Sequence, residues 1–207
     1  MGRVAERAGE QADDRVDDDH RGKLAAREHV VADAQALGGK LRHHALVDAL
    51  EAPAQERHDF FRGEREDSSG ALIKRLLAAP DFEHRAYVVV PDDRALIEAT
   101  LTSWADDDHL DLIVTTGGTG LTDRDVVPEA TRAVVDRLAP GIAEAMRAAG
   151  VTKTPMAMLS RGIAGMRGRT LIVNLPGSPK GVQEGLDVLL PVLPHALGQL
   201  TGEDRGH

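Results

Sequence analysis

A glycine-rich turn surrounded by hydroxyl and carboxylate side chains lies near the middle of the chain. Residues 115–120 read Thr-Thr-Gly-Gly-Thr-Gly, and Asp125 follows in the same loop. Glycine permits positive φ and lets a ligand approach main-chain N–H groups, which suits a phosphate or another anion. Neither Gly-Lys-Ser/Thr nor Gly-x-Gly-x-x-Gly is present in this turn. The turn therefore predicts an anion site that differs from a Walker-type or dinucleotide-binding loop.

A second glycine-bearing turn, Pro176-Gly177-Ser178-Pro179-Lys180, follows another apolar run. Ser178 fits the N-cap of a helix, and Pro179 fits its first position. Each turn comes after an apolar run typical of a buried strand and precedes a helix. Ligands bind beyond the carboxyl ends of parallel strands, so we expect the two turns to share one crevice.

Apolar periodicity predicts the elements that position these turns. Short apolar, partly β-branched runs predict buried strands at residues 87–90, 112–114 and 171–175. Helical spacing predicts helices over residues 72–77, 95–104, 131–138, 141–149 and 181–200, the third with Pro128 in its first turn. A hairpin turn is expected at residues 166–169. This alternation predicts parallel strands joined by right-handed crossovers.

Two aspartates follow predicted strand ends and could meet across the crevice. Asp92 comes after the strand at 87–90, and Asp125 comes after the strand at 112–114. Carboxylate oxygens are ligands that Mg²⁺ prefers, so the pair predicts a magnesium site. Asp92 has the alternative role of a helix cap, and its neighbour Asp93 is an alternative metal ligand.

Composition limits the other possibilities. The chain has 207 residues, a net charge of −9, a pI of about 5.4 and no cysteine. This length suits one α/β domain with an appendage, and the acidic balance argues against nucleic acid or an anionic membrane as partner. There is no disulfide framework, bilayer-spanning run or signal-peptide pattern, so we predict a cytoplasmic protein. The irregularly spaced histidines before residue 63 are read as solvated and not as metal ligands.

The run from Thr115 to Thr131 resembles the signature of the molybdopterin-binding family of molybdenum cofactor biosynthesis. That family includes the molybdopterin adenylyltransferases and the G domain of gephyrin. Its pattern is Thr-Thr-Gly-Gly-Thr-Gly followed by Arg-Asp-Val-x-Pro-Glu/Asp-Ala-Thr, and this chain matches it at residues 115–120 and 124–131. Leu-Ser-Arg at 159–161 and Leu-Pro-Gly-x-Pro at 175–179 match as well. The resemblance implies a three-layer α/β sandwich with a mostly parallel central sheet.

The resemblance also implies a reaction, the Mg²⁺-dependent transfer of AMP from ATP to the phosphate of molybdopterin. It implies Asp92 and Asp125 as catalytic and metal-binding residues. The positions that it implies for binding the pterin or its phosphate are Thr116, Gly117, Gly118, Thr119, Gly120, Glu129, Ser160, Gly177 and Ser178. A homotrimer and contact with the molybdenum-insertion protein of the same pathway are expected. The alternatives are a non-catalytic molybdopterin carrier and a competence-damage-type domain that acts on another nucleotide.

Residues 1–62 depart from the family pattern. Family members have an apolar first strand before the loop that begins here at Gly63, whereas residues 54–62 are polar. We therefore predict an atypical N-terminal segment over 1–62 and a molybdopterin-binding α/β domain over 63–207, with the first strand missing or replaced. The segment is interpreted as disordered, as an accessory extension, or as the product of a shifted reading frame. The intact mass of the native protein tests the last hypothesis.

Overall fold

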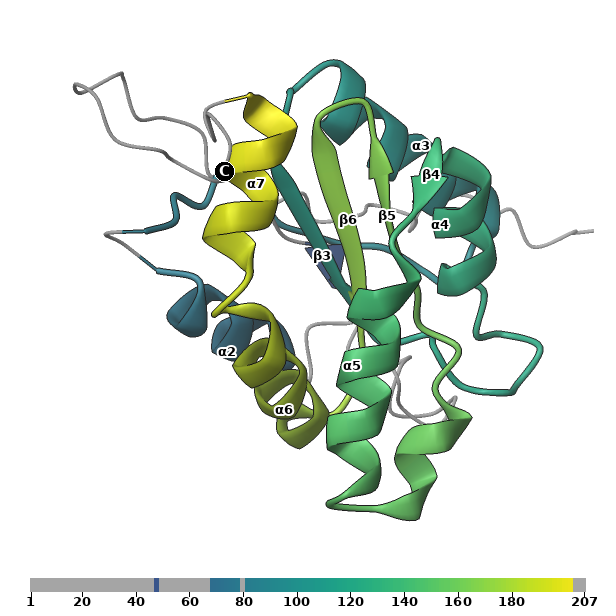
Figure 1. Cartoon of the computed structure of the whole chain (residues 1–207). Coiled ribbons are helices and arrows are strands. Elements are labelled where there is room, and N and C mark those ends of the chain that lie inside the picture. The colour runs from purple at the N-terminus through teal and green to yellow at the C-terminus, as the bar shows by residue number, and fades with distance from the viewer. Residues whose placement is uncertain (1–46, 49–67, 79–80, 203–207) are drawn as a thin grey trace, which may run out of the picture.

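A six-stranded sheet with the order β2-β1-β3-β6-β5-β4 forms the centre of the computed structural model, which describes residues 47–48, 68–78 and 81–202 (Figure 1). The four strands β1, β2, β3 and β6 run parallel, β5 is antiparallel to β6, and β4 is antiparallel to β5. The strands are β1 Val47–Asp48, β2 Val88–Val89, β3 Leu112–Thr116, β4 Arg137–Leu138, β5 Ala164–Arg167 and β6 Thr170–Leu175.

Helices cover both faces of this sheet (Figure 1). The helices are α2 Ser68–Leu76, α3 Arg94–Asp106, α4 Val127–Val134, α5 Pro140–Val151, the 3₁₀ helix η2 Pro155–Leu159, α6 Pro179–Leu189 and α7 Leu193–Thr201. Helices α2, α5, α6 and α7 pack on one face, and α3 and α4 pack on the other. The predicted three-layer α/β architecture is thus confirmed. None of the helices in the described part of the chain has the length and apolar character needed to cross a membrane.

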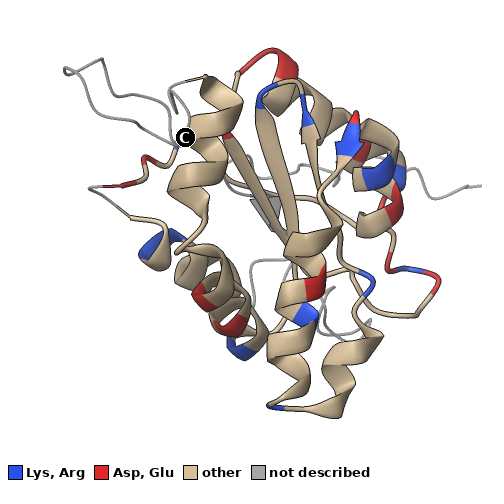
Figure 2. Cartoon of the chain, in the orientation of Figure 1, with Lys and Arg blue, Asp and Glu red and all other residues tan. Residues whose placement is uncertain are grey.

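The two central strands supply apolar side chains to both layers. Along β3, Leu112 and Val114 belong to the core under α2, α6 and α7, whereas Ile113 belongs to the core under α3 and α4. Every residue of β3 and β6 is buried, and neither strand carries a charged side chain (Figure 2). A parallel strand that is covered on both faces requires this composition, and the predicted burial of these two strands is confirmed.

Several element boundaries differ from the sequence-based expectation. The helix expected to reach residue 138 ends at Val134, because Val135 is extended and Arg137–Leu138 pair with β5 as an edge strand. The helix expected over 181–200 is two helices, α6 and α7, which are interrupted at Pro191. Proline cannot donate the helical hydrogen bond and clashes with the preceding turn. Strand β2 is shorter than expected and only half-buried.

Strand β1 lies between β2 and β3, where Val47 pairs with Val88 on one side and with Thr115 on the other. Residues 54–62, for which we predicted the missing or replaced first strand, lie outside the described residues. The predicted division at residues 62/63 and the reading-frame hypothesis also concern residues that are largely outside them. These three statements remain predictions.

Candidate functional site

The two glycine-bearing turns lie side by side. Strands β3 and β6 pair along the full length of β3, from Leu112 opposite Leu171 to Thr116 opposite Leu175. Beyond the last pair, the Thr116 hydroxyl donates a hydrogen bond of 2.6 Å to the carbonyl oxygen of Pro176. The Gly117 amide donates to the Leu175 carbonyl at 3.3 Å. Both turns thus lie together at the carboxyl ends of β3 and β6, as the sequence predicted.

The first turn, residues 117–120, depends on glycine at two positions. Gly117 and Gly118 have φ values of +86° and +61°, which L side chains rarely adopt. A Cβ atom at Gly118 would lie 2.6 Å from Cγ2 of Val127, the first residue of α4. The Val127 amide also donates to the Gly118 carbonyl at 3.3 Å. The glycine therefore lets the turn pack directly against the start of α4.

The second turn, residues 176–178, leads into α6 as predicted. The Ser178 side chain accepts a hydrogen bond of 3.1 Å from the Gly181 amide and caps α6, with Pro179 in the first helical position. The Ser69 hydroxyl at the start of α2 donates to the Gly177 carbonyl at 2.8 Å. The turn is thus held by the cap of α6 and by a residue of α2.

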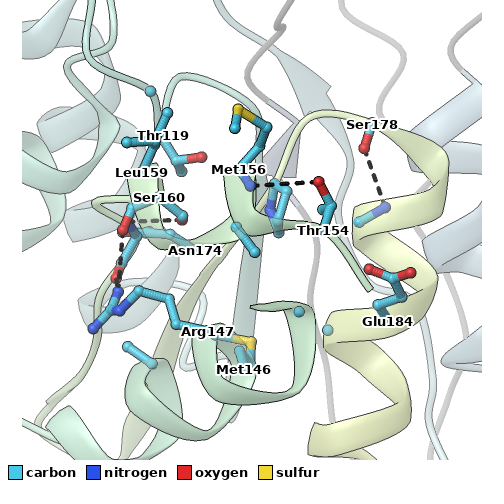
Figure 3. A pocket seen from close by; sticks show the side chains of 18 of the residues that line it. Thr119, Met146, Arg147, Thr154, Met156, Leu159, Ser160, Asn174, Ser178 and Glu184 are labelled. Atoms are coloured by element: carbon cyan, nitrogen blue, oxygen red, sulfur yellow. Dashed lines mark hydrogen bonds between the residues drawn. The ribbon is translucent and has the colours of Figure 1, made fainter. Parts of the chain in front are cut away.

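A cavity of about 350 Å³ opens beside the two turns and extends between α5, α6 and η2 (Figure 3). Its polar lining residues include Thr119, Gly120, Ser160, Asn174 and Ser178. Its apolar lining residues include Ala143, Met146, Met156, Ala157 and Leu159. A cavity of this size, with apolar walls and a few polar groups, suits a small molecule that has both apolar and polar or anionic parts.

Four of the residues that the sequence predicted for ligand binding line this cavity, namely Thr119, Gly120, Ser160 and Ser178. The other predicted binding residues in the two turns are Thr116, Gly117, Gly118 and Gly177, which shape the backbone beside the cavity. Asp92, Asp125 and Glu129 are not among its lining residues. A role for the carboxylates must therefore concern a ligand that extends beyond the cavity.

The cavity is also lined by charged residues, of which the sequence did not identify Arg147 and Glu184. Arg147 on α5 lines the cavity, and its Nη1 donates to the carbonyl oxygens of Gly162 at 2.8 Å and Ser160 at 3.4 Å (Figure 3). Lys180 and Glu184 lie near the N-terminus of α6 with 4.0 Å between Nζ and Oε1. An arginine inside an amphipathic helix looks like any surface residue in the sequence, so no pattern distinguished Arg147.

Asn174 is another residue that the sequence did not identify. It is 1% exposed and lines the cavity. Its amide nitrogen donates to the hydroxyls of Thr115 and Thr131, both at 2.9 Å, and its Oδ1 accepts from the Ile163 amide at 3.1 Å. One side chain therefore joins β3, α4 and the segment that precedes β5. The available signal was a lone amide in the otherwise apolar end of β6.

Asp125 is held in a defined orientation within its loop. Asp125 is only 6% exposed. Its Oδ2 accepts hydrogen bonds from the Thr122 amide at 2.8 Å and from the Thr122 hydroxyl at 2.6 Å. Neither of these two hydrogen bonds involves Oδ1. Mg²⁺ is commonly held by one or two carboxylates together with substrate phosphates. The carboxylate of Asp125 fits that requirement with one oxygen anchored.

The two aspartates after β2 have different environments. Asp93 is the N-cap of α3, because its Oδ1 accepts from the Leu96 amide at 3.0 Å. The capping role considered for Asp92 thus belongs to its neighbour, and Asp92 is half-buried. Strands β2 and β3 are separated only by β1, so their carboxyl ends lie about 10 Å apart at the same sheet edge. Within the described ranges, no cluster of three or more potential ligands could hold a metal by itself.

Glu129, in the first turn of α4, is engaged in an ion pair. Its Oε1 accepts from Nη1 of Arg161, and its Oε2 is buried without a hydrogen-bond partner in the described part of the chain. Arg161 also donates from Nε to the Gly120 carbonyl at 2.5 Å and from Nη2 to the Asp125 carbonyl. The Leu-Ser-Arg segment therefore contributes Ser160 to the cavity and directs Arg161 toward the loop that carries Asp125.

Comparison with known proteins supports this picture. The chain is 41% identical over 145 residues to a molybdopterin adenylyltransferase of Helicobacter pylori, which covers 68% of this chain and 81% of the relative. It is 48% identical over 121 residues to gephyrin of Dictyostelium discoideum, covering 58% of this chain and 16% of gephyrin.

Solved structures and a family model agree with these relatives. The crystal structure of the molybdopterin biosynthesis enzyme MoaB from Thermus thermophilus superposes with a TM-score of 0.69 at 53% identity, covering 78% of this chain and 96% of that one. The family model described as a probable molybdopterin binding domain matches residues 27–195. Since this match spans most of the chain, the protein belongs to the molybdopterin-binding family of molybdenum cofactor biosynthesis.

Proposed function

We propose that the protein is a molybdopterin adenylyltransferase. In this reaction a phosphate oxygen of molybdopterin attacks the α-phosphorus of ATP. A new P–O–P linkage forms, the bond from the α-phosphorus to the bridging oxygen breaks, and pyrophosphate leaves. The observation that carries the proposal is the cavity beside the two adjoining glycine turns. The identity to relatives that are named for this activity supports it.

The lining of the cavity suggests how the pterin substrate binds. The hydroxyls of Thr119, Ser160 and Ser178 are suitable donors for phosphate or for the polar edge of the pterin. Met146 and Met156 provide a surface for the ring system. A terminal phosphate bound at Thr119 and Gly120 would lie near the first turn, on the side of the loop that carries Asp125.

Asp125, together with Asp92, is proposed to hold the Mg²⁺ that accompanies ATP. The cation would neutralise charge on the phosphate oxygens. The anchored Oδ2 of Asp125 supports this role, because two hydrogen bonds from Thr122 orient the carboxylate. Preorganised charges contribute most where little rearrangement is needed during the reaction.

The proposal extends to assembly and location. We expect a cytoplasmic homotrimer that passes its adenylylated product to the molybdenum-insertion protein of the same pathway. This expectation rests on the resemblance to the family. Light scattering on the purified protein measures its mass in solution, and a monomer mass at micromolar concentration would contradict the trimer.

Pyrophosphate release from ATP and molybdopterin tests the activity. Asp125→Asn retains an acceptor for Thr122 but removes the charge, and we expect its rate to fall about 100-fold. Asp123→Ala is the matched control, because Asp123 is exposed in the same loop, and its rate should stay within twofold of the wild type. Equal rates for wild type and Asp125→Asn would refute the catalytic role. Retention of molybdopterin without pyrophosphate release would identify a carrier instead.

A further inference from the structure

We propose that Arg161 is a positioning residue for adenylyl transfer, because it holds the loop of residues 120–125 in the conformation that presents the Asp125 carboxylate. The inference rests on the proposed function and goes beyond it. Arg161 is not among the residues that line the cavity. Its proposed effect on the reaction is exerted through the loop and not through contact with a substrate.

The contacts of Arg161 reach both ends of this loop. Nε donates to the carbonyl oxygen of Gly120 at 2.5 Å, and Nη2 donates to the carbonyl oxygen of Asp125. Nη1 donates to the Glu129 carboxylate on α4. The main-chain amide of Arg161 adds a hydrogen bond of 2.9 Å to the Thr119 carbonyl. A single residue therefore joins the first turn, the end of the loop and the start of α4.

Within the described part of the chain, the loop has few other attachments. Residues 121–124 are exposed, with Leu121 63% exposed, so little apolar packing restrains them. The hydrogen bonds from Thr122 to Asp125 lie within the loop itself. Among the described residues, the hydrogen bonds to residues 120–125 from outside the loop come from Arg161 and from the adjoining Val126, whose amide donates to the Arg124 carbonyl.

The shape of the guanidinium is central to this role. Arginine carries five N–H donors in a rigid planar fork, whereas lysine carries one nitrogen on a flexible stem. Lysine at position 161 can pair with Glu129 but cannot bridge the Gly120 and Asp125 carbonyls in the same geometry. Because both acceptors at the loop ends are main-chain oxygens, the Asp125 carboxylate stays available for a cation.

The test compares Arg161→Lys and Arg161→Ala with the matched pair Arg167→Lys and Arg167→Ala. Arg167 makes the same type of contact, to the Asp106 carboxylate at 2.6 and 2.9 Å and to the Val134 carbonyl at 2.8 Å. Asp106 is the last residue of α3, which precedes β3 in the chain. Arg167 therefore lies near the amino end of β3, whereas the cavity lies near its carboxyl end. Each variant is assayed for kcat, for KM of both substrates, for the Mg²⁺ concentration at half-maximal rate, and for amide exchange over residues 119–126.

We expect Arg161→Lys to lower kcat about 100-fold, the loss that a displacement of about 1 Å can cause. The half-maximal Mg²⁺ concentration should rise severalfold and amide exchange in the loop should accelerate, while both Arg167 variants leave these quantities within twofold of the wild type. Unchanged loop exchange in Arg161→Ala overturns the proposal, whether or not the wild type transfers AMP. Faster exchange with unchanged kcat and Mg²⁺ dependence also overturns it. An inactive wild type would instead refute the proposed function, and loop exchange would still decide whether Arg161 holds the loop.

Discussion

The hydroxyl of Thr116, the last residue of β3, donates a hydrogen bond of 2.6 Å to the carbonyl oxygen of Pro176, the first residue after β6. The two residues are 60 positions apart in the chain. This contact joins the carboxyl ends of β3 and β6 at the point where both glycine turns begin. It therefore couples the shape of one turn to the shape of the other.

Replacing Thr116 with valine should remove this coupling at nearly constant volume. We expect a loss of about 1–2 kcal/mol in the free energy of unfolding, because the Pro176 carbonyl loses its donor. The rate of pyrophosphate release should also fall. The matched control is Thr170→Val, because the Thr170 hydroxyl donates to the Leu110 carbonyl at 2.5 Å at the other edge of the sheet. Equal rates of pyrophosphate release for the two variants, measured under conditions in which both are fully folded, would contradict the coupling.

Gly118→Ala should destabilise the first turn through both its φ value and the clash with Val127. We expect about 2–4 kcal/mol, more than the roughly 1 kcal/mol that positive φ alone costs a non-glycine residue. Gly168→Ala separates the two effects, because Gly168 also has a positive φ but a Cβ atom there would meet no atom within 4 Å beyond its chain neighbours. Urea unfolding of both variants measures the difference. A smaller loss for Gly118→Ala than for Gly168→Ala would refute the packing argument.

Asn174→Ala should be among the most destabilising polar substitutions in the described core. It removes three hydrogen bonds at a site that is 1% exposed and leaves the Ile163 amide without its acceptor. We expect a loss of about 2–4 kcal/mol. Urea unfolding gives the value, and a loss below about 0.5 kcal/mol would show that water or a local shift replaces the amide.

The ion pair of Asp106 and Arg167 predicts a small dependence of stability on acid pH. The hydrogen bond from Arg167 lowers the pKa of the Asp106 carboxyl below its usual value. A carboxylate with a depressed folded-state pKa stabilises the protein above the unfolded value, about 3.9, and this contribution is lost as the pH falls through the folded value. Wild type should therefore exceed Asp106→Asn in unfolding temperature at pH 7, and the difference should shrink below pH 4. A difference that grows with acidification would contradict this sign.

The sequence alone determined the features that depend on neighbouring residues. Unbroken apolar runs predicted the buried central strands, because a strand covered by helices on both faces cannot carry charge. The glycines of the first turn and the Ser178-Pro179 cap of α6 were predicted because backbone conformation and capping are local properties. The family signature falls in these same segments.

Only the tertiary structure decided which distant side chains act together. Asn174 joins three elements, and Arg161 reaches carbonyls about 40 positions away in the chain. Residue types and spacing do not encode such partners, because they depend on how the layers pack. The same reason explains why α4 ends at Val134, where pairing with β5 replaces helical hydrogen bonds. It also explains why Asp93 caps α3, because two adjacent aspartates differ only once the chain direction at the end of β2 is set.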